Sequence, residues 1–554
     1  MKYSVHGAQK RWFKGRIGME KIEGYSYEEL LALRKGTQKP ILAKIQGEYF
    51  ELHGQLRGRQ NLQPVYRGDY VGHKAYERTL SFILVTAFHR LYAHRDLIID
   101  HSISRGLYCW VKDYVLSTEE LQRLQEEMRQ IIHKDLPITK ECMLLQDALD
   151  YFQKRGHDDK YLLLKNMDYQ EVKMYRLLDE CAYFYGKMAP STGHTPLFQL
   201  DGYKEGFVMS YPTVKDPEIL RPFSPQDKLF EIFKETARWD ELLGVNYVGY
   251  LNEKIRQGEA RNLVNITEAL HEKKIAYIAD DIKAREGVKI VLIAGPSSSG
   301  KTSFANRLAV QLRVNGLLPI AVGMDDYFVP RRLTPKKADG SYDFESLEAI
   351  ELDLFERDMA KILAGEEVTL PKFDFKTGTR GLSNHRVKLP ENGVLIIEGI
   401  HGLNPRLLQG IDKGVKFKVY ISALTVLNLD KHSRIATTDV RKLRRMARDY
   451  LSRGYSPEDT LLIFPSVSQG EKVNIFPYQE EADAMFNSTL FYELAVLKKH
   501  TLKELLKISK ESSTYEEAKR LITILRLFED IEDDMVPTNS LLREFIGGSQ
   551  FYDY

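Results

Sequence analysis

The sequence has few cysteines, no long apolar run and no excess of charge of one sign. Only three cysteines, Cys109, Cys142 and Cys181, occur among 554 residues, and no two of them are close in sequence. This argues against a disulfide scaffold, a zinc ribbon and a redox dithiol. No segment approaches the run of about 18 apolar residues that a membrane-spanning helix requires. The basic N-terminal segment MKYSVHGAQKRWFKGR lacks the apolar stretch of a signal peptide. We therefore expect a cytoplasmic protein that makes no membrane contact.

Charge does not indicate a particular partner either. The 80 Lys and Arg residues nearly balance the 78 Asp and Glu residues, which leaves a net charge of +2. Positive potential can still concentrate in one cleft of such a chain. Hydrophobic residues make up 43% of the sequence, which is typical of a globular protein. At one domain per roughly 150 residues, the length predicts three or four domains.

Local patterns divide the chain into a first half of mixed structure and a second half of alternating strands and helices. Residues 40–55 alternate apolar and polar side chains around Gln46-Gly47, which predicts a hairpin. Helical spacing covers 76–92 and 117–132, and Ser117 with Glu120 matches a capping box at the start of the second helix. Residues 227–283 are charged and helical in spacing, which predicts a helical connector.

Four short apolar runs rich in β-branched residues follow this connector. They are separated by segments of helical spacing, which predicts a parallel sheet with helices on both faces, the α/β class. The expected strands are 288–294, 319–324, 394–397 and 417–421.

The first of these strands leads directly into a phosphate-binding motif. The segment from Gly295 to Thr302 fits G-x-x-x-x-G-K-[ST] and opens a predicted helix, the context that this motif requires. We expect ATP to bind with its phosphates against backbone N–H groups and the helix N-terminus. Lys301 should reach the β- and γ-phosphates, and the Thr302 hydroxyl should bind Mg²⁺. The expected ATP-binding residues are Gly295, Pro296, Ser297, Ser298, Ser299, Gly300, Lys301, Thr302 and Ser303.

Carboxylates follow two other predicted strands. Glu398 ends the strand at 394–397, and ligands of open α/β sheets bind at that edge. We therefore expect Glu398 to hold Mg²⁺ together with Thr302. Asp325 and Asp326 follow the strand at 319–324, where a general base would take a proton from an attacking hydroxyl. The guanine-reading sequence N-K-x-D is absent, which weighs against a GTPase.

These motifs resemble the uridine kinase and phosphoribulokinase family across roughly residues 288–490. The sequence Asp325-Asp326-Tyr327-Phe328 matches the family's Asp-x-aromatic-aromatic pattern, and the resemblance implies that Asp325 is the catalytic base. It further implies that Asp343, which follows Tyr342, holds the ribose hydroxyls of a nucleoside substrate.

The substrate segment departs from the family pattern at two positions. It runs from Pro371 to Arg380, and the resemblance implies that Phe373 and Arg380 face the substrate. Uridine-cytidine kinases have Tyr and His where this chain has Phe373 and Gly378. Because a site that reads its substrate by hydrogen bonds depends on such groups, base preference is left open.

The family also has an arginine-rich helix that closes over the phosphates as a lid. The segment from Arg441 to Gly454 is similar, and its guanidinium groups would stabilise charge on the transferring phosphoryl group. The expected lid residues are Arg444, Arg445, Arg448 and Arg453.

The first half of the chain resembles a different family. Residues 20–72 are similar to the TGS module of threonyl-tRNA synthetases, and 73–225 to the editing domain that follows it there, on the segments STEELQRLQEEMRQIIHKDLP and Ala189-Pro190-Ser191-Thr192-Gly193. The four positions that carry histidines and a cysteine in the editing domain are Arg78, Phe82, Phe184 and Met188 in this chain. None can serve as a metal ligand or hydrolytic base in their place. We expect no editing activity, and RNA contact, small-molecule sensing and dimerisation remain open roles.

Together these patterns predict a nucleoside kinase fused to a synthetase-like region. The expected units are a TGS-like module at 1–72, an editing-like domain at 73–225, a connector at 226–284 and a P-loop kinase domain at 285–554. The kinase would transfer the γ-phosphoryl group of ATP to the 5′-hydroxyl of uridine or cytidine, using Mg²⁺. Two alternatives stand: a sugar or sugar-phosphate kinase of the same family, and an RNA-binding regulator that senses ATP.

Overall fold

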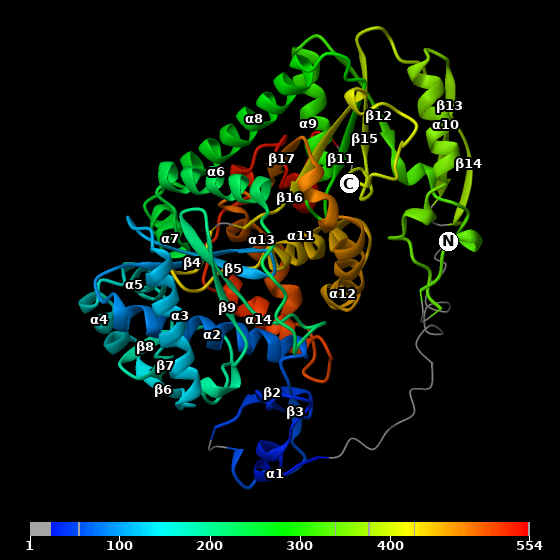
Figure 1. Cartoon of the computed structure of the whole chain (residues 1–554). Coiled ribbons are helices and arrows are strands. Elements are labelled where there is room, and N and C mark those ends of the chain that lie inside the picture. Colours follow the sequence, from blue (N-terminus) through cyan, green and yellow to red (C-terminus); the bar gives the residue numbers. More distant parts are fainter. Residues whose placement is uncertain (1–23, 54–55, 338–339, 375–376, 426, 552–554) are drawn as a thin grey trace.

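The computed structural model describes residues 24–53, 56–337, 340–374, 377–425 and 427–551. The N-terminal segment examined for a signal peptide lies outside these residues. Figure 1 shows a small module at the lower end of the molecule, a mixed region beside it, and a domain built on a five-stranded sheet above. The fold is α/β overall.

The small module is a three-stranded antiparallel sheet with one short helix. Its strands pair in the order β2-β1-β3. The hairpin predicted for residues 40–55 is confirmed by β1 and β2, and Gln46 and Gly47 turn it with positive φ angles of 47° and 92°. The elements are α1 (Tyr27–Ala32), β1 (Leu42–Ile45), β2 (Glu48–Glu51) and β3 (Gln63–Val65).

The mixed region packs two helices on a four-stranded antiparallel sheet, with a smaller three-stranded sheet beside it. The predicted capping box is confirmed, because the Ser117 side chain accepts the Glu120 N–H and the Glu120 carboxylate accepts the Ser117 N–H. The helix predicted from residue 76 begins earlier, at Tyr70. The elements are α2 (Tyr70–Leu91), β4 (Leu97–Ile103), β5 (Gly106–Val111), α3 (Thr118–His133), β6 (Thr139–Leu144), α4 (Leu145–Lys154), α5 (Asp158–Leu164), β7 (Glu171–Leu177), β8 (Glu180–Tyr183), β9 (Gln199–Tyr203) and β10 (Gly206–Ser210).

Three helices join this region to the large sheet. They confirm the helical prediction for 227–283, and they contribute buried side chains to the same hydrophobic core as the sheet. The segment is therefore an integral part of the domain's packing. Its helices are α6 (Asp227–Leu243), α7 (Val248–Arg256) and α8 (Ala260–Ala284).

The large sheet is fully parallel, in the order β12-β15-β11-β16-β17. All four predicted strands are present, and β17 is a fifth. Strands β11 and β15 are buried along nearly their whole length, as helices on both faces of a parallel sheet require. The elements are β11 (Ile290–Ala294), α9 (Lys301–Val314), β12 (Leu318–Gly323), α10 (Leu352–Leu363), β13 (Val368–Asp374), β14 (Thr379–Val387), β15 (Gly393–Glu398), β16 (Lys416–Ser422), α11 (Thr437–Ser452), α12 (Pro457–Asn474), β17 (Ala484–Asn487), α13 (Glu493–Leu505), α14 (Tyr515–Leu525) and α15 (Arg543–Ile546).

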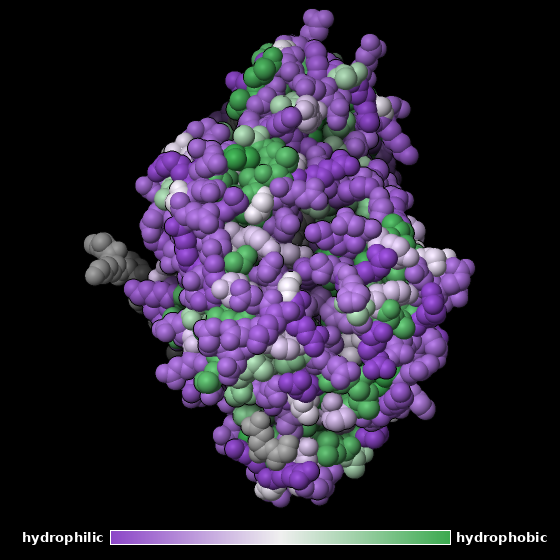
Figure 2. Space-filling view, turned by 90° about the vertical axis from the view of Figure 1, so that its left-hand side faces the viewer, coloured by the Kyte–Doolittle hydropathy of each residue, from purple (hydrophilic) through white to green (hydrophobic). Residues whose placement is uncertain are grey.

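The face of the molecule in Figure 2 is mostly hydrophilic, and its hydrophobic residues gather in small patches. In the described part of the chain, no helix combines the length and the apolar character needed to cross a membrane.

Candidate active site

The loop between β11 and α9 has the backbone conformation of a phosphate cradle. Ser298 and Gly300 adopt positive φ angles of 59° and 85°. At Gly295 a Cβ atom would lie 2.0 Å from the carbonyl oxygen of Ile421, so only glycine fits against the neighbouring strand. The loop therefore curves tightly before α9 begins at Lys301.

Polar groups without partners line this loop. The hydroxyls of Ser298 and Ser299 are buried and have no hydrogen-bond partner in the described structure. The Lys301 Nζ donates to the carbonyl oxygens of Gly295 (3.0 Å) and Pro296 (3.3 Å), so it folds back over the loop. Buried donors of this kind require an acceptor, and the loop fits the phosphates of ATP.

The predicted metal ligands meet in the structure. The Thr302 hydroxyl donates to Glu398 at 2.9 Å. Burial raises the pKa of Glu398 to about 7, and nearby Glu544 and Asp325 add to the effect while Lys301 opposes it. A carboxyl group in this state would exchange its proton for a divalent cation.

The chain alone offers only a partial metal site. Among the described residues, no three His, Cys, Asp or Glu side chains cluster in a way that could hold a metal ion. Mg²⁺ commonly takes one or two protein ligands and completes its shell with substrate phosphates and water. Thr302 and Glu398 fit that pattern.

The structure separates the two neighbouring aspartates after β12. Asp326 accepts the Phe373 N–H at 3.3 Å and pairs with Lys372 at 3.3 Å, so it anchors β13. The backbone carbonyl of Asp325 accepts the Phe328 N–H at 3.3 Å, whereas its carboxylate forms no hydrogen bond or ion pair with the described residues. Burial raises the pKa of the Asp325 carboxyl. The positive charge of Lys301 opposes this shift, and the negative charge of Asp326 adds to it. Asp325 is therefore the carboxylate left available near Lys301.

The sheet register explains why these groups meet. Glu398 at the end of β15 pairs with Gly323 of β12 on one side and with Ile293 of β11 on the other. The ends of three adjacent parallel strands thus carry Asp325, Glu398 and the phosphate loop along one edge.

Asp343 lies in a turn beside another acid that the sequence motifs did not indicate. Its Oδ1 accepts the Glu345 N–H at 3.3 Å. Burial raises the pKa of Glu345, which nearby Glu471 also raises, whereas Lys301 and Arg445 lower it. Glu345 therefore lies within the electrostatic reach of the phosphate loop.

The predicted substrate residues on β13 and β14 are held by packing and by an ion pair. Phe373 is buried, with its ring 5.6 Å from that of Phe328. Arg380 pairs with Glu351 and also donates to the Phe328 carbonyl at 3.4 Å. Gly378 has a φ of +71°, and a Cβ there would lie 2.7 Å from the Arg331 Nε. The space beside Gly378 is thus occupied by Arg331.

Two arginines of helix α11 contact the phosphate loop, one through a side chain of the loop and the other through its backbone. Arg445 donates to the Ser297 hydroxyl at 2.8 Å and is partly buried. Arg444 is fully buried, where it pairs with Glu493 at 2.6 Å and donates to the Ser298 carbonyl at 3.4 Å. The Arg444 guanidinium is thus held between Glu493 and the phosphate loop, and its predicted role as a lid residue stays a prediction.

The other two predicted lid arginines gather on one carboxylate at the end of α11. Arg448 pairs with Asp449 at 2.8 Å, and Arg453 lies 3.5 Å from the same side chain. The Arg453 side chain is about half exposed, so it can turn toward a ligand.

Two buried glutamates at this site were not predicted from the sequence. Glu471 on α12 accepts the Ser297 N–H at 2.8 Å and pairs with Arg441. Glu544 on α15 accepts the Ser303 hydroxyl at 2.8 Å. Both come from segments with no recognisable motif and far from the loop in sequence, so no local pattern could reveal them.

The four positions that correspond to the synthetase editing residues also lie together, but as packing. Phe82, Phe184 and Met188 are buried, and the two rings meet edge to face at 5.4 Å. Arg78 donates to the Lys187 carbonyl oxygen. This cluster holds no imidazole or thiol.

Comparison with known proteins gives matches to both halves of the chain. Residues 290–490 match the phosphoribulokinase / uridine kinase family. Uridine-cytidine kinase A of Dictyostelium discoideum is 27% identical over 172 residues, 31% of this chain and 30% of that protein. A threonine–tRNA ligase of Acetivibrio thermocellus is 28% identical over 185 residues, 32% of this chain and 29% of that enzyme. The chain thus spans less than a third of the length of either relative.

Among solved structures, a possible uridine kinase from Bacillus stearothermophilus is 25% identical, with a TM-score of 0.23, and the match covers 27% of this chain and 79% of that one. The site geometry and the sequence matches agree on the two parts of the molecule. Residues 290–490 form a domain of the phosphoribulokinase and uridine kinase family, preceded by a region homologous to threonyl-tRNA synthetases.

Proposed function

We propose that the chain is an ATP-dependent nucleoside kinase that phosphorylates the 5′-hydroxyl of its substrate, with uridine and cytidine as first candidates. One observation carries the proposal. The phosphate loop, the Thr302–Glu398 pair and the unpaired Asp325 lie at the ends of adjacent strands. A nucleotide switch needs only the phosphate loop and the metal ligands. A kinase also needs a base for the attacking hydroxyl, the role proposed for Asp325.

In the proposed reaction, Asp325 accepts the proton of the substrate hydroxyl as its oxygen bonds to the γ-phosphorus. The bond from that phosphorus to the β-bridging oxygen breaks, and ADP leaves. Lys301 and Arg445 stabilise charge on the phosphoryl oxygens. A Mg²⁺ ion held by Thr302 and Glu398 would neutralise phosphate charge.

We assign the units as a TGS-like module at 1–72, an editing-like domain without editing activity at 73–225, a helical segment at 226–284 and the kinase domain at 285–554. The apolar packing of Phe82, Phe184 and Met188 supports the loss of editing. The shared core of α6 to α8 with the sheet supports treating 226–284 as part of the kinase's structural framework.

A sugar or sugar-phosphate substrate is the alternative that the site favours next. Phe373 has no polar tip, and Gly378 is covered by Arg331. A site with these two residues loses two hydrogen bonds to a pyrimidine base, which weakens discrimination between bases. Asp343, proposed to orient ribose hydroxyls, would serve either substrate class.

The test is transfer of labelled γ-phosphoryl from ATP to uridine, cytidine, purine nucleosides, thymidine and ribulose 5-phosphate. Asp325→Asn is the catalytic variant, and Asp326→Asn is its matched control because Asp326 anchors β13. We expect transfer to at least one acceptor, lost in Asp325→Asn and largely kept in Asp326→Asn. Absence of transfer to every acceptor, with salt-dependent retention of RNA, would replace the kinase proposal with the regulator.

A further inference from the structure

A short segment of the kinase domain, residues 427–434, lies against the synthetase-like region. It belongs to the link between β16 and α11. Its main chain is held on two sides at Lys431. The Ile99 N–H, on β4, donates to the Lys431 carbonyl oxygen at 2.8 Å, and the Asp159 carboxylate, on α5, accepts the Lys431 N–H at 2.8 Å. Two elements of the synthetase-like region therefore fix the backbone of this segment.

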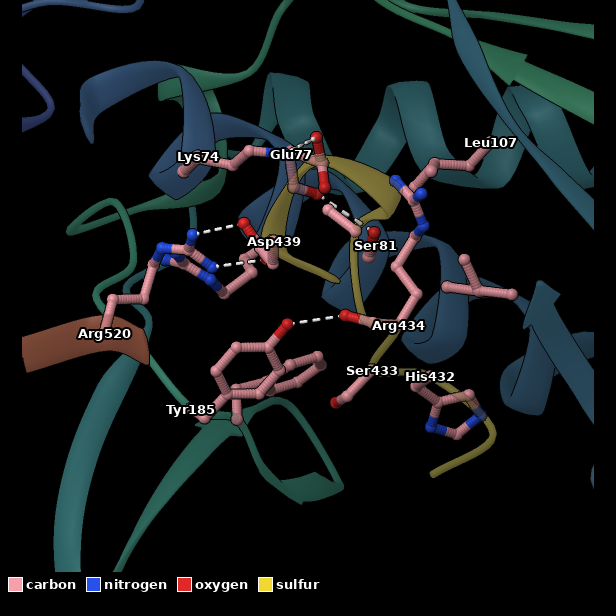
Figure 3. Close-up of a pocket in the computed structure, with 14 residues that line it drawn as sticks. Lys74, Glu77, Ser81, Leu107, Tyr185, His432, Ser433, Arg434, Asp439 and Arg520 are labelled. Atoms are coloured by element: carbon pink, nitrogen blue, oxygen red, sulfur yellow. Dashed lines mark hydrogen bonds and ion pairs between the residues drawn. The ribbon is translucent and has the colours of Figure 1, made fainter. Parts of the chain in front are cut away.

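The end of the segment is held just before α11 begins at Thr437. The Tyr185 hydroxyl donates to the Arg434 carbonyl oxygen at 2.6 Å, and Figure 3 shows the hydroxyl directed at the main chain of Arg434. In the same view, Arg520 of α14 faces Asp439 of α11. The start of α11 is thus held by the synthetase-like region on one side and by the kinase domain on the other.

A buried ion pair joins the two regions at the same segment. The Lys160 Nζ, on α5, lies 2.7 Å from Asp430 Oδ1, and the two side chains are only 3% and 1% exposed. The same Asp430 oxygen accepts the His432 N–H at 2.8 Å. Removing one partner of such a pair leaves the other charge buried and uncompensated, so the pair is much more sensitive to substitution than a surface pair.

Lys160 also acts on the second carboxylate of this contact. Burial raises the pKa of Asp159, but the positive charge of Lys160 and the hydrogen bond from the Lys431 N–H outweigh it, so the pKa lies below its usual value. Asp159 is therefore ionised and accepts strongly from the Lys431 N–H. One lysine supports both carboxylates that hold the segment.

Helix α11, which follows the segment, contacts the phosphate loop further along its length. Arg441 donates to the Ser297 carbonyl oxygen at 2.8 Å, and Arg445 donates to the Ser297 hydroxyl at 2.8 Å. Because a helix transmits displacement along its axis, a shift at the start of α11 would also move these two guanidinium groups. The contact with the synthetase-like region is thus connected to the phosphate loop by a single helix.

We propose that Lys160 is a positioning residue for phosphoryl transfer, which fixes residues 427–434 through Asp430 and thereby sets the position of α11 and of Arg445 at the phosphate loop. The proposal rests on the proposed kinase function, in which Arg445 stabilises charge on the phosphoryl oxygens. It gives the synthetase-like region a part in the kinase reaction that requires neither RNA nor a second ligand.

The first test is the kinetics of Lys160→Met. A misplacement of 1 Å can cost about 100-fold in rate. Because Asp439 keeps its partner Arg520, we expect a smaller fall in kcat, about tenfold per folded molecule. The Kd for ATP should stay close to that of the parent protein, since β11 and α9 still hold the phosphate loop. An unchanged kcat would overturn the proposal, and so would an equal loss of ATP affinity.

Two further variants compare charge and place. Lys160→Arg keeps the charge and should recover most of the lost turnover. Lys165→Gln is the matched control, because Lys165 caps the same helix and pairs with Glu253 at 2.8 Å, with both side chains about one-quarter exposed. It should leave kcat unchanged. If Lys165→Gln lowers kcat as much as Lys160→Met does, the effect does not come from the contact with residues 427–434.

A double variant separates positioning from folding. Lys160→Met leaves Asp430 as a buried charge without a partner and should lower the unfolding midpoint. Adding Asp430→Asn removes that charge and should raise the midpoint again, but the contact that positions α11 is still missing, so kcat should stay low. Recovery of both the midpoint and kcat would mean that Lys160 serves folding only.

Hydrogen–deuterium exchange tests the connection without using activity. Lys160→Met should speed exchange in the first turns of α11 and in the phosphate loop, whereas Lys165→Gln should not. Exchange that stays at the parent rate in α11 would overturn the positioning role. If the parent protein transfers phosphoryl to no acceptor, the kinase function fails, and the exchange rates still decide whether Lys160 positions α11. The two failures are therefore distinguishable.

Discussion

The two halves of this molecule differ in the side chains that occupy the positions where a site was expected. The kinase domain keeps polar side chains at the edge of its sheet, several of them unpaired or with a raised pKa. The synthetase-like region fills the corresponding editing positions with Phe82, Phe184 and Met188. Both regions keep a continuous hydrophobic core. The comparison teaches that a continuous core alone does not mark a site, and that unsatisfied polar groups are the better sign of a candidate site.

The largest expected effect is on the reaction itself. Asp325→Asn should reduce kcat by about 100- to 10,000-fold, because the amide cannot take the hydroxyl proton. Steady-state kinetics with the preferred acceptor measure this, and ATP binding should stay close to that of the parent protein. If Asp325→Asn kept more than half of the parent turnover, Asp325 would not be the catalytic base, and the proposed difference between the two halves would be wrong.

Shortening a buried side chain in the synthetase-like region should lower the free energy of unfolding and leave the rate of phosphoryl transfer unchanged. Phe82→Ala removes a fully buried ring that contacts Phe184 and should lower the free energy of unfolding by about 3–5 kcal/mol. Denaturant unfolding measures the change, with exposed Leu91→Ala on the same helix as control. Turnover per folded molecule should be unaffected. A specific loss of turnover would mean that this cluster acts in the reaction.

The raised pKa of Glu398 predicts that the stability of the kinase domain depends on pH. Burial raises that pKa from 4.5 to about 7, so the folded state binds a proton more tightly than the unfolded state. The free energy of unfolding of the metal-free protein should therefore rise as pH falls from 7 toward 4.5, by up to about 3 kcal/mol from this group. Unfolding at several pH values, compared between the parent and Glu398→Gln, isolates the contribution. Equal slopes in both proteins would show that Glu398 is not perturbed.

Catalysis should depend on pH in the opposite direction to stability, because Mg²⁺ needs the ionised form of Glu398. Protonated Glu398 is a poor ligand for Mg²⁺, so kcat/KM for MgATP should fall as pH drops below the pKa of Glu398 in the free enzyme. Glu398→Gln should flatten that limb of the profile. A profile unchanged by the substitution would assign the metal to other ligands.

Sequence reasoning succeeded where the determinants are local. The turn at Gln46-Gly47, the capping box of Ser117 and Glu120, and the phosphate loop between one strand and the next helix depend on residues within a few positions of one another. Four strands of the parallel sheet were also predictable, since they contain short, largely apolar runs.

Contacts between distant segments were not predictable in this way. Glu471 and Glu544 meet the phosphate loop from segments 174 and 241 residues away, and a buried acid on a helix has no distinctive pattern. Arg444 is a similar case, because the motif that contains it does not reveal its ion-pair partner, Glu493, which lies on another helix. The connector was predicted as helices, but its burial against the sheet follows from tertiary packing.

The smallest expected effect concerns the contact between the halves. Lys187 of the synthetase-like region and Glu516 of the kinase domain pair at 2.8 Å, with Lys187 still partly exposed. Such a pair contributes about 0–1 kcal/mol, because water screens it and two side chains lose freedom. Lys187→Gln should therefore shift the unfolding midpoint only slightly. A double-mutant cycle with Glu516→Gln measures the coupling. A coupling well above 1 kcal/mol would mean that this pair is stronger than a water-screened surface pair and contributes to holding the two halves together.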